Sequence, residues 1–164
     1  MPSLESEATL QQSMLDRLLD YEPKNRTEAR VSRAQSLRQF KSALRRDLEW
    51  LLNTRRTPEA AFEDTPQLAR SVYNYGLPDT SSVSLNSPTD QARLLRNLEE
   101  ALQRFEPRLQ QVQVSMLSPT ANSRTVHFQI EGLLRIDPAP ERICFDTVLE
   151  LTRGDYQVEG EHGA

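Results

Sequence analysis

One short segment of this 164-residue sequence places an acid and a base on either side of a proline: RFEPRL, residues 104–109. Glu106 is the candidate general acid if the protein is an enzyme, because glycoside hydrolysis needs a protonated carboxyl group opposite a second carboxylate. Arg108 argues against that role, since a guanidinium two residues away favours the ionised carboxylate. The sequence also shows no cluster of aromatic residues suited to a sugar chain. A glycoside-cleaving enzyme using Glu106 therefore remains only as the alternative function.

The same segment is better explained as a structural device. Pro107 lacks a backbone N–H and disfavours a helical conformation for the residue before it, so a helix should end at Glu106. Residues two apart in extended backbone point to the same side, which pairs Glu106 with Arg108. The pair can bind internally or can exchange partners with another subunit through bidentate hydrogen bonds. Both possibilities stay open, and we assign Glu106, Pro107 and Arg108 to a partner-binding site.

Other catalytic chemistry finds little support in the sequence. Cys144 is the only cysteine and lies in a strand-like run, without an activating partner. His127 falls on the polar side of another such run, and the second histidine, His162, is far along the chain. The five glycines form no phosphate-binding loop, and no zinc-ligand spacing occurs. We therefore predict no catalytic residue, no metal site and no cofactor.

Charge is distributed unevenly although the net charge is only -4. Residues 31–56 hold seven Lys or Arg against two acids, whereas residues 57–164 hold nine against sixteen. A basic helix using Arg38, Arg45 and Arg46 could follow nucleic acid, but the acidic remainder argues against it. A salt-bridged surface or a protein docking face is the better prediction.

The N-terminus has neither the basic region nor the apolar region of a secretory signal. The apolar runs are far shorter than the ~18 residues of a membrane span. Together with the single cysteine, these features predict a cytoplasmic protein without membrane insertion.

The elements that must position Glu106 and Arg108 begin with a long helix. Ser36 is its expected N-cap, with Gln39 in the capping-box position. Trp50 lies about 140° from the centre of the apolar stripe, so it is either covered by another part of the fold or contacts a partner. We assign Trp50 to the partner-binding site. The stripe itself consists of Leu37, Phe40, Leu44, Leu48 and Leu51.

A helix-stop signal and a second strong helix follow. The segment QLARSVYNYGLPD should end in a structural turn formed by Tyr75, Gly76, Leu77 and Pro78, with Gly76 in the left-handed position. The next helix should start at Ser87 as N-cap, with Pro88 and Asp90 in its first turn. Its buried residues are expected to be Leu94, Leu95, Leu98, Leu102 and Phe105.

After Pro107 the hydrophobic period changes from helical to alternating, which predicts strands around residues 112–116, 126–130 and 143–151. The fold class is therefore α+β, with helices packed on one face of a small, mainly antiparallel sheet of three to four strands. The domain limits are a 1–30 N-terminal arm with a short helix, a single 31–155 domain, and a 156–164 flexible tail.

Several spaced motifs resemble the TssE family of type VI secretion baseplate subunits. They are EPKNR at 22–26, SLRQFKSALRRDLEWLLNTRR, ARSVYNYGLPD and RFEPRLQQVQV. The same family contains the wedge protein of contractile phage tails that is often labelled lysozyme-like. That label implies peptidoglycan as the substrate of the alternative function, a lysozyme-like enzyme using Glu106.

The resemblance implies a structural subunit of the baseplate wedge, located in the cytoplasm at the inner-membrane-docked baseplate. Its implied partners are the wedge proteins TssF and TssG, other baseplate components such as TssK, and the contractile sheath of TssB and TssC. It implies a link to the first sheath ring, whose strands a free sheet edge would template by β-augmentation. It also associates Glu106, Pro107 and Arg108 with the wedge core.

Overall fold

A computed structural model describes residues 10, 13–19, 32–57, 65–69, 71–80, 84, 87–117 and 124–162. The motif at residues 22–26 and most of the expected N-terminal arm lie outside these residues. The chain divides into two compact units, Met1–Arg45 and Arg46–Ala164, and each is described by itself.

The first unit contains a short helix and the start of a long one. Helix α1 spans Met14–Leu18 and is capped by Ser13, whose hydroxyl accepts a hydrogen bond from the Asp16 N–H. Helix α2 spans Arg33–Asn53 and crosses into the second unit. The apolar side chains of α1 are exposed, with Met14 and Leu18 each 77% exposed.

The start of α2 corrects the expected cap. The Ser32 hydroxyl accepts from the Gln35 N–H, and the Gln35 side chain accepts from the Ser32 N–H, which is a complete capping box. The spacing Ser-x-x-Gln occurs twice, at 32–35 and 36–39, and the upstream copy starts the helix. Ser36 is instead buried inside α2, where its hydroxyl accepts from the Leu10 N–H.

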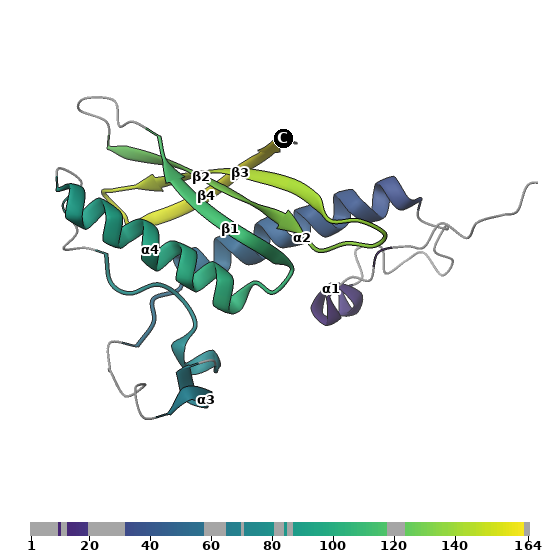
Figure 1. The fold of residues 1–164 in the computed structure, drawn as a ribbon, viewed down its shortest axis with the longest axis horizontal. Helices are drawn as coiled ribbons and strands as arrows, with labels where there is room; N and C mark the ends of the chain where they lie inside the picture. The colour runs from purple at the N-terminus through teal and green to yellow at the C-terminus, as the bar shows by residue number, and fades with distance from the viewer. Residues whose placement is uncertain are drawn as a thin grey trace, which may run out of the picture. The chain divides into compact units, whose positions relative to one another are not determined.

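The second unit is built on a four-stranded antiparallel sheet in the order β1-β2-β3-β4. Helix α4, Pro88–Phe105, precedes the sheet in sequence and runs beside β1 (Figure 1). Together they confirm the α+β class. The strands are β1 Leu109–Met116, β2 Thr125–Leu134, β3 Glu141–Glu150 and β4 Asp155–His162.

The fourth strand corrects the expected flexible tail for residues 156–162. β4 pairs with β3 in the register Leu149↔Tyr156 and Thr147↔Val158. Tyr156 and Val158 are 3% and 6% exposed, so they extend the apolar face of β3. The sequence DYQVEGEH contains only two such residues, which made its alternation easy to miss.

Helix α4 forms as its sequence predicts. The Ser87 hydroxyl accepts from the Asp90 N–H, and Pro88 occupies the first turn, where no backbone donor is needed. Leu94, Leu98 and Leu102 are buried as expected. Leu95 and Phe105 are only partly buried, and Ala101 is buried in addition.

The described part of the connection between α2 and α4 contains two short helices rather than one. They are α3, Pro66–Ala69, and the 3-10 helix η1, Val72–Asn74. Gly76 follows with φ 106°, and Leu77 forms an isolated parallel bridge with Arg55. The Leu77 N–H donates to the Thr54 carbonyl at 2.8 Å, which fixes this turn against the end of α2.

One face of the sheet forms the core of the second unit. Val126, Phe128 and Ile130 of β2 are each 1–2% exposed. Their β3 partners Leu149, Thr147 and Phe145 are buried on the same face. On the helices, Leu48, Leu51 and Leu52 of α2 are buried together with the α4 residues named above.

Candidate functional site

The Glu106 and Arg108 side chains bind each other at the junction of α4 and β1. The Arg108 Nε and Nη2 atoms donate to the two carboxylate oxygens of Glu106, each at 2.6 Å. Glu106 is the C-cap of α4, with φ -119° and ψ 78°, because Pro107 prevents the helix from continuing. The two-point contact matches the planar guanidinium fork to a carboxylate, which is the strong geometry for such a pair.

A third residue, Asp47 of α2, completes the cluster. The Arg108 Nη2 atom also donates to Asp47 Oδ2 at 2.7 Å, and Arg46 donates to Asp47 Oδ1 at 2.8 Å. Two acids and two arginines therefore alternate along one network. The network joins the last turns of α2 to the end of α4 and the start of β1. We call Asp47, Glu106 and Arg108 the ionic junction.

The ionic junction is largely withdrawn from solvent. The side chains of Glu106, Arg108 and Asp47 are 6%, 20% and 21% exposed. Burial alone would lower the pKa of Arg108, but its hydrogen bonds and charge contacts with the two carboxylates raise it above its ordinary value. Arg108 is therefore held in its charged form, and each partner depends on the others for compensation.

Tyr75 lies next to this junction. Burial, followed by the charges of Asp47 and Glu106, raises the pKa of its hydroxyl group. Its ring meets Phe105 edge to face, with centroids 5.2 Å apart. The turn that contains Tyr75 is therefore packed against the end of α4.

The network also reaches Trp50, which the structure leaves 54% exposed. Another part of the fold covering this side chain was one of the two expectations, and among the described residues that expectation is wrong. The Arg46 guanidinium lies 5.1 Å from the centre of the Trp50 ring. One residue thus contacts both the indole and Asp47. An exposed tryptophan that is held in this way has the character of an interface anchor.

Asp47 was not selected from the sequence, and Arg46 was considered there only as a possible nucleic-acid contact. Asp47 lies three residues after Leu44 and four before Leu51, which places it on the apolar stripe of α2. A lone acid on such a stripe requires a cationic partner, and this signal could have found it. Its partner Arg108 is 61 residues away, so only the fold identifies the pair.

Gly76 occupies a position that no larger residue can take without rearrangement. A Cβ atom there would lie 2.2 Å from the Thr54 carbonyl oxygen, and the φ of 106° strains any L side chain. The backbone of the turn can therefore approach the end of α2 closely. Leu77 is buried beside it, and Tyr75 and Pro78 are partly buried.

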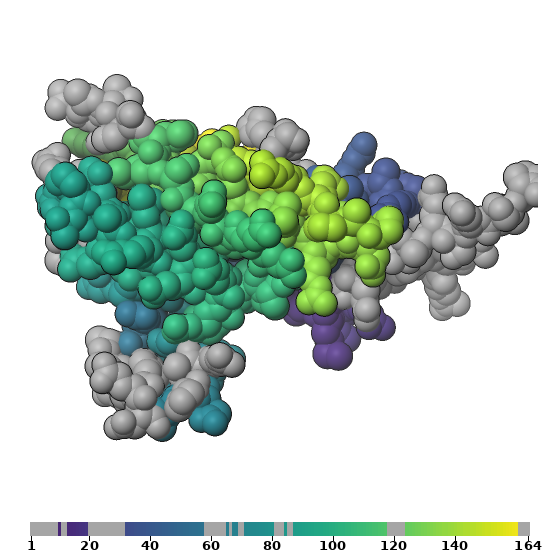
Figure 2. Space-filling view, in the orientation of Figure 1, coloured from purple at the N-terminus to yellow at the C-terminus, as the bar shows by residue number. Residues whose placement is uncertain are grey.

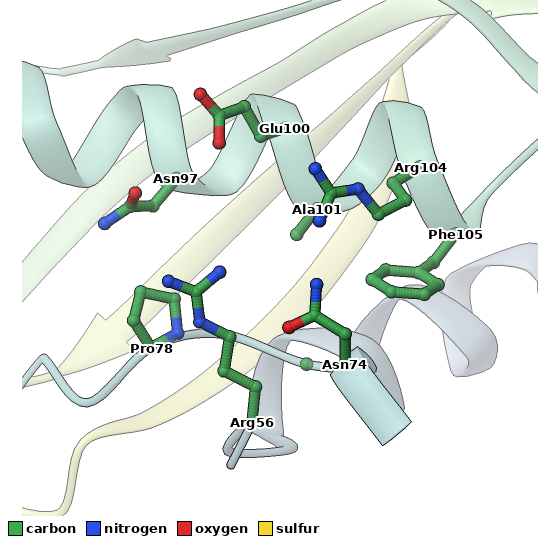
Figure 3. A pocket seen from close by; sticks show the side chains of 9 residues that line it. Arg56, Asn74, Pro78, Asn97, Glu100, Ala101, Arg104 and Phe105 are labelled. Atoms are coloured by element: carbon green, nitrogen blue, oxygen red, sulfur yellow. The ribbon is translucent and has the colours of Figure 1, made fainter. Parts of the chain in front are cut away.

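A small pocket lies between this turn and α4 (Figure 3). Its side chains include the guanidinium groups of Arg56 and Arg104, the amides of Asn74 and Asn97, and the carboxylate of Glu100. Glu106 does not line it, and both Glu106 oxygens are occupied by Arg108. Glu106 is therefore not placed to contact a substrate bound in this pocket.

The remaining chemical candidates are ordinary strand residues. Cys144 is buried in β3, and burial raises the pKa of its thiol, which disfavours the reactive thiolate. His127 is exposed on β2. Within the described ranges, no group of three or more His, Cys, Asp or Glu is placed to hold a metal ion, and no helix has the length and hydropathy to cross a membrane.

The described residues thus show an ionic junction whose carboxylates are bound by arginines, and an exposed tryptophan near it, on a small α+β scaffold. The family model of the baseplate wedge protein gp25 matches residues 38–139, and this chain belongs to that family. The match includes most of α2, the ionic junction and strands β1 and β2. Membership of this family assigns the chain a structural role in a baseplate.

No curated protein matches the chain. Among solved structures, a chain of "The baseplate complex from the type VI secretion system" is 18% identical, with a TM-score of 0.47; the match covers 68% of this chain and 94% of that chain.

Proposed function

We propose that this chain is a TssE-type subunit of a type VI secretion baseplate, which links the wedge proteins to the first ring of the contractile sheath and helps sheath polymerisation to start. The observation that carries the proposal is the gp25 wedge family match over residues 38–139, which contains both Trp50 and the ionic junction. The proposed partners are TssF and TssG in the wedge, TssB and TssC in the sheath, and baseplate components such as TssK. The proposed location is the cytoplasmic side of the inner membrane.

The geometry suggests different tasks for the two parts of the partner-binding site. Glu106 and Arg108 already satisfy each other and Asp47, so breaking them apart to bind another chain would leave buried charge uncompensated. Their task is to fix the angle between α2, α4 and β1. Trp50, held by Arg46 and 54% exposed, is the better direct contact. Pro107 is exposed between Glu106 and Arg108 and can contact a partner without disturbing them.

The test is co-purification of TssF and TssG with the full chain. Trp50→Ala should reduce recovery of the wedge proteins while leaving the thermal unfolding of the isolated chain unchanged. Arg108→Ala should reduce recovery together with stability, because it removes the centre of the junction. Ala92→Ser, at an exposed position of α4, is a control that should change neither. Full recovery with Trp50→Ala and Arg108→Ala would remove the wedge-docking role.

The enzymatic alternative is tested separately. A cell-wall clearing assay compares the native chain with Glu106→Gln, and the proposal expects no clearing by either. Clearing by the native chain that the variant lacks would show that Glu106 is catalytic.

A further inference from the structure

The pocket between the turn and α4 is formed by three segments of the second unit. Arg56 contributes from the segment that follows α2, and η1 and the turn contribute Asn74, Gly76 and Pro78. Another face of α4 adjoins β1, as teal and green atoms show in the space-filling view (Figure 2). The α4 residues that line the pocket have the spacing of one helix face, and they are Asn97, Glu100, Ala101, Arg104 and Phe105.

Backbone and aromatic contacts fix the walls of this pocket. The Arg56 N–H donates to the Leu77 carbonyl at 2.9 Å, and the Leu77 N–H donates to the Thr54 carbonyl at 2.8 Å. On the opposite wall, the Tyr75 ring packs against Phe105 of α4. The pocket is therefore formed before any ligand arrives, which reduces the entropic cost of binding.

Two arginine side chains bring positive charge to the pocket, and we call it the arginine pocket. Figure 3 shows the Arg56 and Arg104 guanidinium groups directed toward the space beside the Asn74 amide, whereas the Glu100 carboxylate points away. Within the described part of the chain, neither guanidinium forms an ion pair. Two cations that face one small space repel each other, and an anion bound between them removes that repulsion.

A local explanation covers one of these arginines but not the other. Arg104 lies in the last turn of α4, where a cation interacts favourably with the carbonyl groups at the helix end. Glu100 lies one turn earlier, at a spacing that allows an ion pair, yet the described structure shows none between the two. Arg56 lies outside the helices, on a different wall of the pocket, and has no such role. The convergence of the two guanidinium groups therefore points to a bound anion.

The hydrogen-bond donors of the arginine pocket suit a carboxylate. A guanidinium presents a planar fork of N–H groups that matches the two oxygens of a carboxylate, and the Asn74 and Asn97 side chains add amide donors. Asn74 is only 3% exposed, so its amide lies at the inner end of the pocket. The pocket is small and has room for one functional group, not for a nucleotide or a sugar ring.

The surface beside the pocket indicates that the carboxylate belongs to a protein. A 3-10 helix has three residues per turn, so the residues of η1 point in different directions. Asn74 lines the pocket, whereas Val72 and Tyr73 are 86% and 44% exposed. Exposed apolar side chains beside a charged site favour a protein partner, because apolar burial supplies affinity and the charge supplies specificity.

We propose that the arginine pocket receives the carboxylate of an Asp or Glu side chain of a partner protein, and that apolar neighbours of this acid contact Val72 and Tyr73. The inference rests on the proposed function, because the partner is taken to be the TssF–TssG pair. It adds to the Trp50 contact a second docking point, with a stated chemistry for the side chain that binds there.

The first experiment titrates the free, full-length chain with a short acidic peptide, acetyl-Leu-Glu-Leu-amide, and follows the arginine Nε–H signals by NMR. The Arg56 and Arg104 signals should shift together, because one carboxylate contacts both guanidinium groups. The neutral counterpart acetyl-Leu-Gln-Leu-amide should cause a much smaller shift, since it lacks charge-assisted hydrogen bonds. Arg96, an exposed arginine of α4 outside the pocket, is the internal control.

Three results of this titration would overturn the inference. They are no shift with the acidic peptide, equal shifts with both peptides, and shifts with inorganic phosphate but not with the acidic peptide. The last result would show that the pocket takes a free tetrahedral anion and not an acidic side chain.

The second experiment measures the affinity of the purified TssF–TssG pair for the full chain. Arg56→Gln and Arg104→Gln should each weaken binding about tenfold or more, because each removes a charge-assisted contact. Arg104→Lys keeps the charge without the planar fork, and its affinity should lie between those of Arg104→Gln and the wild type. Glu100→Gln should bind about twofold to fivefold tighter, because it removes a like charge near the incoming carboxylate. Arg96→Gln, the matched control, should bind as the wild type does.

The melting temperatures of these variants show whether a loss of affinity reflects a loss of fold. Neither Arg56→Gln nor Arg104→Gln should lower the melting temperature, because neither side chain has an ion pair to lose among the described residues. If one of them unfolds, the Glu100→Gln and Arg104→Lys affinities still test the pocket.

The outcomes separate the pocket from the proposed function. If the wild type binds TssF–TssG and both glutamine variants bind equally well, the pocket does not dock the wedge proteins and the inference is wrong. If Arg96→Gln weakens binding as much as the pocket variants do, general positive charge attracts the partner, which also overturns the inference. If the wild type does not bind TssF–TssG, the proposed function fails, and the peptide titration still reports whether the pocket binds an acidic side chain.

Discussion

Two contacts near the end of α2 differ in how strongly the fold should depend on them. Asp47 binds Arg108 through opposite charges, in a cluster whose side chains are 6–21% exposed. Asn53 binds the backbone of Tyr156 through neutral hydrogen bonds from an exposed position. One helix therefore makes a charged contact that is costly to break and a neutral contact that costs less to break.

The difference follows from solvation. A charge left alone in a poorly solvated site loses both its partner and much of its hydration, so removal of one member costs about 3–5 kcal/mol. A neutral hydrogen bond at the surface contributes only about 0.5–1.5 kcal/mol, since water can take either place.

Arg108→Ala should have the largest effect. It leaves the Glu106 carboxylate, with a side chain only 6% exposed, without its cationic partner, whereas Asp47 keeps its contact with Arg46. We expect the free energy of unfolding to fall by about 3–5 kcal/mol, measured by urea denaturation. Arg108→Lys keeps the charge but loses the two-point contact. Its free energy of unfolding should therefore lie between those of the alanine variant and the wild type. A loss below about 1 kcal/mol for Arg108→Ala would show that the junction behaves as a surface ion pair.

Alkaline pH should weaken the attachment of β4. Burial raises the pKa of Tyr156 to about 12, whereas the unfolded chain has the ordinary value near 10. The folded state then binds more protons between these values, so stability is fully present below about pH 10 and falls as the pH rises toward 12, by up to about 2–3 kcal/mol. Tyr75, whose pKa is also raised, adds to the same decline.

The measurement is urea denaturation as a function of pH in the wild type and Tyr156→Phe. The phenylalanine variant should lose most of the decline that Tyr156 contributes and keep the smaller part from Tyr75. An identical pH dependence in both proteins would contradict the assignment.

Asn53→Ala should cost less than either, about 1–2 kcal/mol, because the two hydrogen bonds that it removes join neutral groups. The measurement is again urea denaturation. Asn53→Asp keeps an acceptor for the Tyr156 N–H but loses the donor, and should retain part of the stability. If Asn53→Ala cost as much as Arg108→Ala, the contact would be a permanent part of the fold.

Trp50→Ala should have the smallest effect on stability, below about 1 kcal/mol, because the ring is 54% exposed and its main described contact is the Arg46 guanidinium. The melting temperature in differential scanning calorimetry checks this expectation. A large decrease would mean that Trp50 serves the fold and not a docking surface.

Much of the fold could be predicted from short-range sequence signals. The Ser87, Pro88 and Asp90 signal starts α4, and Pro107 ends it, because caps and proline act within one turn. Two local sequence signals led to wrong predictions, for the start of α2 and for β4. Ser-x-x-Gln occurs twice, and only the structure shows that Ser32 is the cap. β4 has two buried residues among polar ones, so it becomes a strand only when β3 offers a partner.

The candidate site likewise has one part that local sequence signals predict and another that only tertiary packing determines. The sequence by itself determined that Glu106, Pro107 and Arg108 form a helix end with an acid beside a base, because these are short-range constraints on backbone and charge. Only the tertiary structure decided that Asp47 joins them, that Trp50 stays exposed, and that Asn53 holds Tyr156 across 103 residues of sequence. Such contacts depend on how distant segments pack, and no local pattern encodes which distant group will meet a given side chain.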